Sequence, residues 1–84
     1  MSAVQVRYRG NLAALTGRME ETMDAEDVNG LLKTIRRQYS PEAEKAARSM
    51  LIALNGESIL LLKRFKTTLS NGDKVSFFPL CAGG

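Results

Sequence analysis

Apolar and polar residues alternate at the start of the chain. Val4, Val6 and Tyr8 are separated by single polar residues. This period of two predicts a half-buried strand. The intervening residues are Gln or Arg, so the second face of the strand is expected to be open to solvent. Gly10 breaks the pattern and ends the strand.

The next segment carries weaker signals. Asn11 can cap a short helical turn, which Gly17 would close with a left-handed conformation. Residues 18–23 are expected to form a second strand with both of its methionines on one face. Glu21 lies between those methionines and indicates a strand at the edge of a sheet.

A longer helical pattern follows and is predicted to begin at Asp24. The side chain of Asp24 can accept a hydrogen bond from the amide of Asp27 and so cap the helix. Apolar residues then recur at helical spacing, which predicts a stripe facing the core. The residues of this stripe are Val28, Leu31, Leu32, Ile35 and Tyr39.

The second half of the chain reads as a short helix and a hairpin. Ser40 followed by Pro41 predicts the start of a helix that ends near Ser49. Residues 50–54 are almost continuously apolar and predict a covered strand. Asn55-Gly56 is a strong hairpin signal, with residues 59–62 expected to return as the partner strand. Residues 63–70 have no clean period and are expected to form a loop.

The last fifteen residues hold the candidate chemistry. A turn at residues 71–73 leads into a strand over residues 74–78, and Pro79 ends ladder pairing because it has no N–H. Fully extended, residues 80–84 reach about 16 Å, far enough to enter another protein's active site. Gly83 and Gly84 have no side chains, so they fit a narrow tunnel and leave a terminal carboxylate open to attack.

The Gly-Gly pair also has a plain explanation. Two terminal glycines arise by chance in roughly 0.5% of chains, and chain ends are commonly frayed. The pair taken alone therefore leaves a reactive carboxylate and an ordinary chain end as alternatives.

Length and composition narrow the function. Eighty-four residues suit one domain, residues 1–84, of which 80–84 form the tail. A net charge of +3, spread evenly, argues against nucleic acid. One Cys and no His leave little prospect of a zinc site or of a general base near neutral pH. No leader or membrane span is apparent, so a cytoplasmic protein that is not an enzyme on its own is expected.

Three tail motifs resemble the C-terminal signature of the MoaD/ThiS family of ubiquitin-like sulfur carriers. These motifs are Gly72-Asp73-Lys74-Val75, Phe77-Phe78-Pro79 and Ala82-Gly83-Gly84. Leu12–Gly17 is similar to the family's first loop, and Leu54-Asn55-Gly56 to its middle hairpin. Many molybdopterin synthase small subunits have a second Pro and then Val where this chain has Leu80 and Cys81.

The resemblance implies an α+β, ubiquitin-like β-grasp fold, with a mixed sheet packed on one main helix and a flexible Gly-Gly tail. It implies a sulfur carrier with no bound cofactor. An ATP-dependent activating enzyme of the MoeB/ThiF type would adenylylate Gly84, and sulfur would then replace AMP to give a thiocarboxylate. The acceptor would be a MoaE-like large subunit of molybdopterin synthase, or another enzyme such as one of thiamine biosynthesis. A protein modifier joined to lysines through Gly84 is the rival class.

Two expectations concern the residues around the tail. The tail that enters the partner's active site would comprise Leu80, Cys81, Ala82, Gly83 and Gly84. Phe78 is expected on the open face of the last strand near Arg7, where an aromatic and a cation would form a partner-binding face; the alternative is that Phe78 completes the core. Cys81 is either a nucleophile or a small apolar tail residue.

Overall fold

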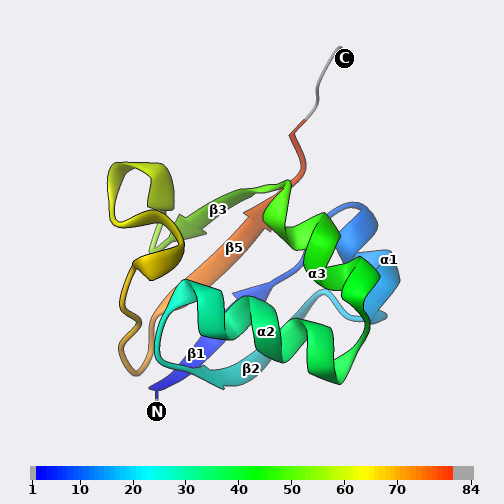
Figure 1. The fold of residues 1–84 in the computed structure, drawn as a ribbon, viewed down its shortest axis with the longest axis horizontal. Helices are drawn as coiled ribbons and strands as arrows, with labels where there is room; N and C mark the ends of the chain where they lie inside the picture. The colour runs from blue at the N-terminus through cyan, green and yellow to red at the C-terminus, as the bar shows by residue number, and fades with distance from the viewer. Residues whose placement is uncertain (1, 81–84) are drawn as a thin grey trace.

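The computed structural model describes residues 2–80; Met1 and the predicted tail residues Cys81, Ala82, Gly83 and Gly84 lie outside this range. Strands and helices follow one another along the chain as drawn in Figure 1. The strands are β1 (Ser2–Arg7), β2 (Glu20–Ala25), β3 (Leu51–Leu54), β4 (Glu57–Ser58) and β5 (Lys74–Phe78). The helices are α1 (Asn11–Thr16), α2 (Val28–Gln38) and α3 (Pro41–Arg48), with 3-10 turns η1 (Ile59–Leu61) and η2 (Arg64–Lys66).

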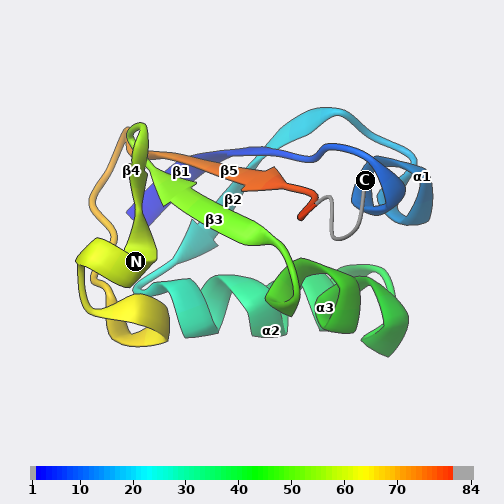
Figure 2. The ribbon, with the colours of Figure 1, turned by 90° about the horizontal axis from the view of Figure 1, so that it is seen from above.

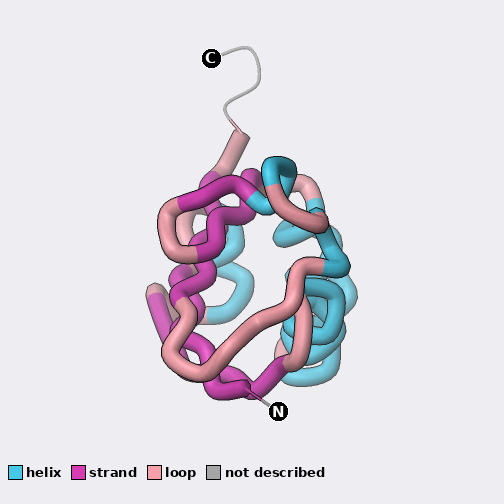
Figure 3. The backbone as a smooth tube through the Cα atoms, turned by 90° about the vertical axis from the view of Figure 1, so that its left-hand side faces the viewer, coloured by secondary structure: helices cyan, strands magenta, loops and turns pink. Residues whose placement is uncertain are grey.

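The strands form one sheet in the order β2-β1-β5-β3-β4. β1 and β5 are parallel, and the other neighbouring pairs are antiparallel. Figure 2 shows α2 and α3 beneath one face of this sheet, and Figure 3 shows the strands and helices as two layers. The mixed sheet packed on one main helix confirms the expected α+β, ubiquitin-like β-grasp architecture.

The core lies between the inner face of the sheet and α2. Alternate residues of the central strands point inward, as the period of two predicts. Burying each large apolar side chain contributes about 1.5–3 kcal/mol, so this contact stabilises the position of the central strands β1 and β5. The buried residues of these elements include Val4, Val6, Val75 and Phe77 from the strands and Val28, Leu31, Leu32 and Ile35 from α2.

The start of the main helix differs from the sequence prediction. Asp24 belongs to β2 and pairs with Ala3 of β1. Asp27 caps α2 instead, and its carboxylate accepts a hydrogen bond from the Gly30 amide at 2.7 Å. The prediction was wrong because either aspartate could cap a helix, and only pairing with β1 decides between them.

The hairpin is also shorter than predicted. Asn55 and Gly56 adopt positive φ angles of 50° and 86°, which confirms the two-residue turn. The returning strand is β4, only two residues long, and the predicted strand over residues 59–62 is wrong because Ile59–Leu61 form a 3-10 turn. Of that apolar run only Ile59 is buried.

The remaining elements match with small shifts. β2 begins at Glu20 and lies at the sheet edge, as Glu21 indicated. Gly10 rather than Asn11 occupies the N-cap of α1, whereas Gly17 closes that helix with the predicted left-handed conformation. Ser40 caps α3 as predicted. Within residues 2–80, no helix combines the length and apolar character needed to cross a membrane.

Candidate functional site

The base of the tail is built on the central strand of the sheet. β5 lies between β1 and β3, and its end is fixed by pairing on both sides. Ser76 lies opposite Arg7 of β1, and Phe78 lies opposite Leu51 of β3. The chain therefore leaves the sheet from a point that two neighbouring strands hold in register (Figure 1).

A close contact sets the direction in which the chain leaves. Gly10, in the loop after β1, has a φ of 58°. A Cβ atom at this position would lie only 2.7 Å from Cγ of Pro79. The Pro79 ring therefore occupies the space that any other residue's side chain would need, and only glycine allows this approach.

Phe78 lies on the outer face of the sheet, as predicted. Val75 and Phe77 are fully buried, whereas Phe78 is 36% exposed. Leu51 shares the outer face because directly paired residues point to the same side of a sheet. Leu80 is also exposed. The role of Phe78 in binding a partner stays a prediction.

The cation over the Phe78 ring is Arg9, which was not predicted. The role of the predicted Arg7 in binding a partner stays a prediction. The guanidinium carbon of Arg9 lies 5.5 Å from the centre of the Phe78 ring. Arg7 is level with Ser76 and lies 3.5 Å from the carboxylate of Glu20. The sequence reasoning did not fix the register of β1 against β5. This register brings Arg9, two residues past the end of β1, level with Phe78, the last residue of β5. We call Arg9, Leu51, Phe78 and Leu80 the tail root.

A carboxylate on β2 is shared by two tyrosines. The hydroxyl of Tyr8 donates to Oε2 of Glu21 at 2.6 Å, and the hydroxyl of Tyr39 donates to the same oxygen. Burial, and then the hydrogen bond to Glu21, raises the pKa of both tyrosines above the ordinary value. Because the Tyr8 ring also stacks on Phe77 at 6.2 Å, these contacts link β2 and the end of α2 to the strand that carries the tail root.

The arrangement at the tail root suits binding to another protein. Over residues 2–80, the structure brings no three His, Cys, Asp or Glu side chains together as a metal site. The tail root instead offers an aromatic ring, a cation and two aliphatic side chains on a fixed base. Such a surface can dock another protein and aim the segment that follows Leu80.

Comparisons with solved structures agree with this fold. The chain matches the small archaeal modifier protein 1 of Methanosarcina acetivorans with a TM-score of 0.88 and 24% identity, over 100% of this chain and 98% of that one. It matches a putative molybdopterin converting factor subunit 1 of Pyrococcus furiosus with a TM-score of 0.76 and 24% identity, covering 94% and 98% of the two chains. A complex of subunits 1 and 2 of the molybdopterin-converting factor from Helicobacter pylori matches with a TM-score of 0.69 and 23% identity, covering 98% and 99%.

The fold and the tail root thus define a ubiquitin-like β-grasp protein. The ThiS family model matches residues 6–84, and the chain belongs to this family of ubiquitin-like sulfur carriers. Small carriers of this type work as partners in complexes and not as catalysts. A comparison with curated protein sequences gives no match.

Proposed function

We propose that Gly84 is the reactive residue and that its carboxylate carries sulfur as a thiocarboxylate. The observation that carries the proposal is the sequence Ala82-Gly83-Gly84, one residue after Leu80 of the tail root, in a member of the ThiS family. The two glycines fit a narrow tunnel, and the rigid end of β5 supplies a fixed base for docking.

The chemistry requires an activating partner because a carboxylate resists nucleophiles. A carboxylate oxygen of Gly84 attacks the α-phosphorus of ATP, pyrophosphate leaves, and a mixed anhydride with AMP forms. A hydrosulfide equivalent from a sulfur donor then attacks the acyl carbon, and AMP leaves with its electron pair. ATP is thus a substrate of the activating enzyme, of the MoeB/ThiF type, and this chain holds no cofactor.

We further propose that the sulfur is delivered to a pterin precursor, with this chain as the small subunit of molybdopterin synthase. Two of the similar structures carry molybdopterin converting factor in their names, and one of them is a complex of subunits 1 and 2. A MoaE-like large subunit is therefore the proposed acceptor, with the tail root docked at the entrance to its active site.

A protein modifier is the second candidate. The small archaeal modifier protein 1 covers the whole chain with a TM-score of 0.88, which favours this alternative on structural likeness. In that case the activated Gly84 is attacked by a substrate lysine, AMP leaves and an isopeptide bond forms. The candidates differ in product: a carrier accumulates a thiocarboxylate, whereas a modifier accumulates conjugates of larger mass.

Intact-mass measurement tests the carrier proposal. Incubation with a MoeB-like activating enzyme, ATP and sulfide should replace one oxygen by one sulfur at Gly84. Deletion of Gly84, or extension of the chain past it, should abolish the exchange while the fold is preserved. Thiolation of the extended chain at the normal rate would overturn the proposal. A ladder of lysine conjugates in cells, without any thiocarboxylate, would favour the modifier.

A further inference from the structure

A second apolar surface lies on the 3-10 turns between β4 and β5. Leu60 and Leu61 are 62% and 76% exposed, and Leu62 and Phe65 also reach solvent. We call these four residues the leucine surface. Neighbouring apolar side chains with this much exposure mark interaction sites on soluble proteins, and the carrier chemistry makes no use of them.

The backbone beneath the leucine surface is tied to the core. Ile59 and Leu69, on either side of it, are buried. The carbonyl of Thr67 accepts from the Val28 amide at 3.1 Å, and its hydroxyl accepts from the Lys63 amide at 3.0 Å. The turn is therefore an ordered part of the fold and not a loose loop.

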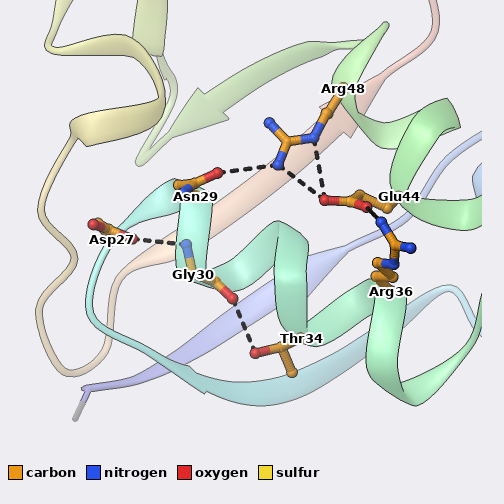
Figure 4. A network of polar contacts seen from close by, with 7 residues as sticks. All are labelled: Asp27, Asn29, Gly30, Thr34, Arg36, Glu44 and Arg48. Atoms are coloured by element: carbon orange, nitrogen blue, oxygen red, sulfur yellow. Dashed lines mark hydrogen bonds and ion pairs between the residues drawn. The ribbon is translucent and has the colours of Figure 1, made fainter. Parts of the chain in front are cut away.

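Phe65 is held by an arginine that is itself fixed. The guanidinium carbon of Arg48 lies 5.2 Å from the centre of the Phe65 ring. The same guanidinium donates to the carboxylate of Glu44 at 2.9 Å and to Oδ1 of Asn29 at 3.0 Å (Figure 4). Arg36 contacts the other oxygen of Glu44 at 3.4 Å. This network preorganises Phe65, which lowers the entropy cost of binding at that side chain.

The leucine surface borders a recess of about 500 Å³. Leu61 and Leu62 line it together with Lys63, Thr67 and Thr68. The recess can receive apolar side chains that protrude from another protein.

The charges beside the leucine surface are positive. Lys63, Arg64 and Lys66 form no ion pair with any residue from 2 to 80. Arg64 also adopts a positive φ of 53°, which is uncommon for a residue other than glycine. A partner that covers the leucine surface would therefore place carboxylates beside these three cations.

The leucine surface and the tail root lie at opposite ends of the sheet. β3 begins beside Phe78, and its far end at Leu54 leads into β4 and η1. Figure 2 shows the same separation, with the 3-10 turns at one end and the end of β5 at the other. A protein bound at one end thus leaves the other accessible.

We propose that the leucine surface docks an acidic amphipathic helix of a partner protein while the tail root engages a different site. Leucine or phenylalanine side chains of that helix enter the recess, and glutamates along its flanks pair with Lys63, Arg64 and Lys66. Helices commonly bind in this way, with anchors spaced at i, i+3 or i+4 and i+7. The inference goes beyond the carrier chemistry and does not depend on it.

Chemical-shift mapping with a synthetic peptide tests the proposal. The probe is a peptide of about 18 residues, long enough to form a helix, with Leu and Phe on one face and Glu on both flanks. Titration into the full chain should shift amides of residues 60–66 and leave those of the tail root unchanged. A scrambled peptide, and one with Lys for Glu, should bind at least about tenfold more weakly.

Matched variants make the test specific. Leu61→Glu should abolish the shifts. Met19→Glu should retain them, because Met19 is similarly exposed but precedes β2, at the opposite edge of the sheet from β4 and the 3-10 turns. The double variant K63E/K66E should lose the Glu peptide and gain the Lys peptide, which keeps the test decisive if Leu61→Glu fails to fold.

Three results would overturn the proposal. The first is absence of shifts at millimolar peptide, or equal binding of the scrambled control. The second is binding to anionic phospholipid vesicles that Leu61→Glu abolishes, because the occupant would then be a membrane. The third is self-association that the same substitution abolishes, because the leucine surface would then be covered by a second copy.

Discussion

The tail root and the leucine surface both combine exposed apolar side chains with an arginine, yet they are supported in different ways. Phe78 and Leu51 stand on paired strands, and their neighbours in sequence form the core. Leu60, Leu61 and Phe65 stand on 3-10 turns, where a side-chain network through Arg48 holds the aromatic ring. The first surface depends on the register of the whole sheet, and the second on a few local contacts.

Because of this difference, we expect that the leucine surface can be changed by mutation without a change in the tail root, but not the reverse. Residues far apart that share no partner contribute independently to stability. Changes at Arg48 should therefore leave the tail root intact, whereas changes in β5 should affect the whole molecule. The predictions below test this independence.

The largest effect is expected where the tail root meets the core. Phe77→Ala should lower the free energy of unfolding by about 3–5 kcal/mol, because Phe77 is fully buried. Phe78→Ala should leave that free energy nearly unchanged and weaken binding to the activating enzyme by about 1–3 kcal/mol. Chemical denaturation and calorimetric titration measure the two quantities. A large fall in stability for Phe78→Ala, with binding preserved in the folded fraction, would assign Phe78 to the core.

The contact between Gly10 and Pro79 gives a way to disturb the tail root alone. Gly10→Ala forces a strained φ and a clash with the Pro79 ring, and should cost about 1–3 kcal/mol. Gly17→Ala is the matched control, because φ there is +71° and nothing lies within 4 Å of the added Cβ. Both variants are compared by thermal unfolding and by rate of thiolation. Only Gly10→Ala should slow thiolation, and equal slowing would show that Pro79 does not aim the tail.

Alkaline and acidic pH should affect the two ends differently. The raised pKa of Tyr8, due first to burial and then to Glu21, means that the folded state keeps a proton that the unfolded chain releases above about pH 10. Stability from this proton is complete below pH 10 and falls by up to about 1.4 kcal/mol per pH unit above it. Tyr8→Phe should reduce the fall in the free energy of unfolding above pH 10, as measured by urea denaturation across pH. An unchanged slope would contradict the assignment.

At acidic pH the change should appear beside the leucine surface. The hydrogen bond from Arg48 lowers the pKa of Glu44, so the stabilisation is present above the ordinary glutamate pKa and is lost as pH falls through the lowered value. Amide signals of residues 61–66 should shift in that range while those of the tail root stay in place. Shifts of the leucine surface and the tail root over the same pH range would contradict the independence of these two surfaces.

A smaller effect is expected when the support of Phe65 is removed. Arg48→Ala should lower stability by about 1 kcal/mol or less, because it removes one cation–π contact and a partly exposed ion pair. Hydrogen exchange of residues 61–66 should accelerate, and the acidic peptide should bind more weakly. Arg36→Ala is the control, because Arg36 pairs with the same glutamate without contacting Phe65. If both variants had equal effects, the contact between Arg48 and the Phe65 ring would have no role beyond the ion pair with Glu44.

The smallest effect is expected at Cys81, which lies outside the described residues. Cys81→Ala should still accept and donate sulfur, with at most a modest change in partner affinity, because a small apolar residue is expected there. Intact mass and a sulfur-transfer assay check this. Complete loss of transfer with the fold intact would make the thiol a participant.

Elements with short-range signals could be predicted from the sequence. The alternation in β1, the Ser40-Pro41 start of α3 and the Asn55-Gly56 turn all lie where they were expected. Each signal depends on the chemistry of a few adjacent residues, such as a hydroxyl that caps a helix or a glycine that accepts positive φ.

The features that the sequence did not predict correctly all depend on tertiary contacts. Asp24 has a side chain that could cap a helix, but it lies in β2, where it pairs with Ala3 of β1. The run from Ile59 to Leu62 is apolar enough for a strand, yet only Ile59 reaches the core. Arg9 was missed at the tail root because its proximity to Phe78 depends on the register of β1 against β5. No periodicity within one strand encodes its offset from another.

The central place of β5 also governs the order of events during synthesis. A ribosome makes β5 after the other four strands, yet β5 lies between β1 and β3 and completes the sheet. Proteins generally begin to fold as they are made. Here β1 cannot pair with its parallel partner until that strand, almost seventy residues later in the sequence, has been synthesised. A translation product that stops before Lys74 lacks both the strand and the tail. Under the proposed function, an activating enzyme would therefore meet a folded tail root only on chains that have been translated through β5.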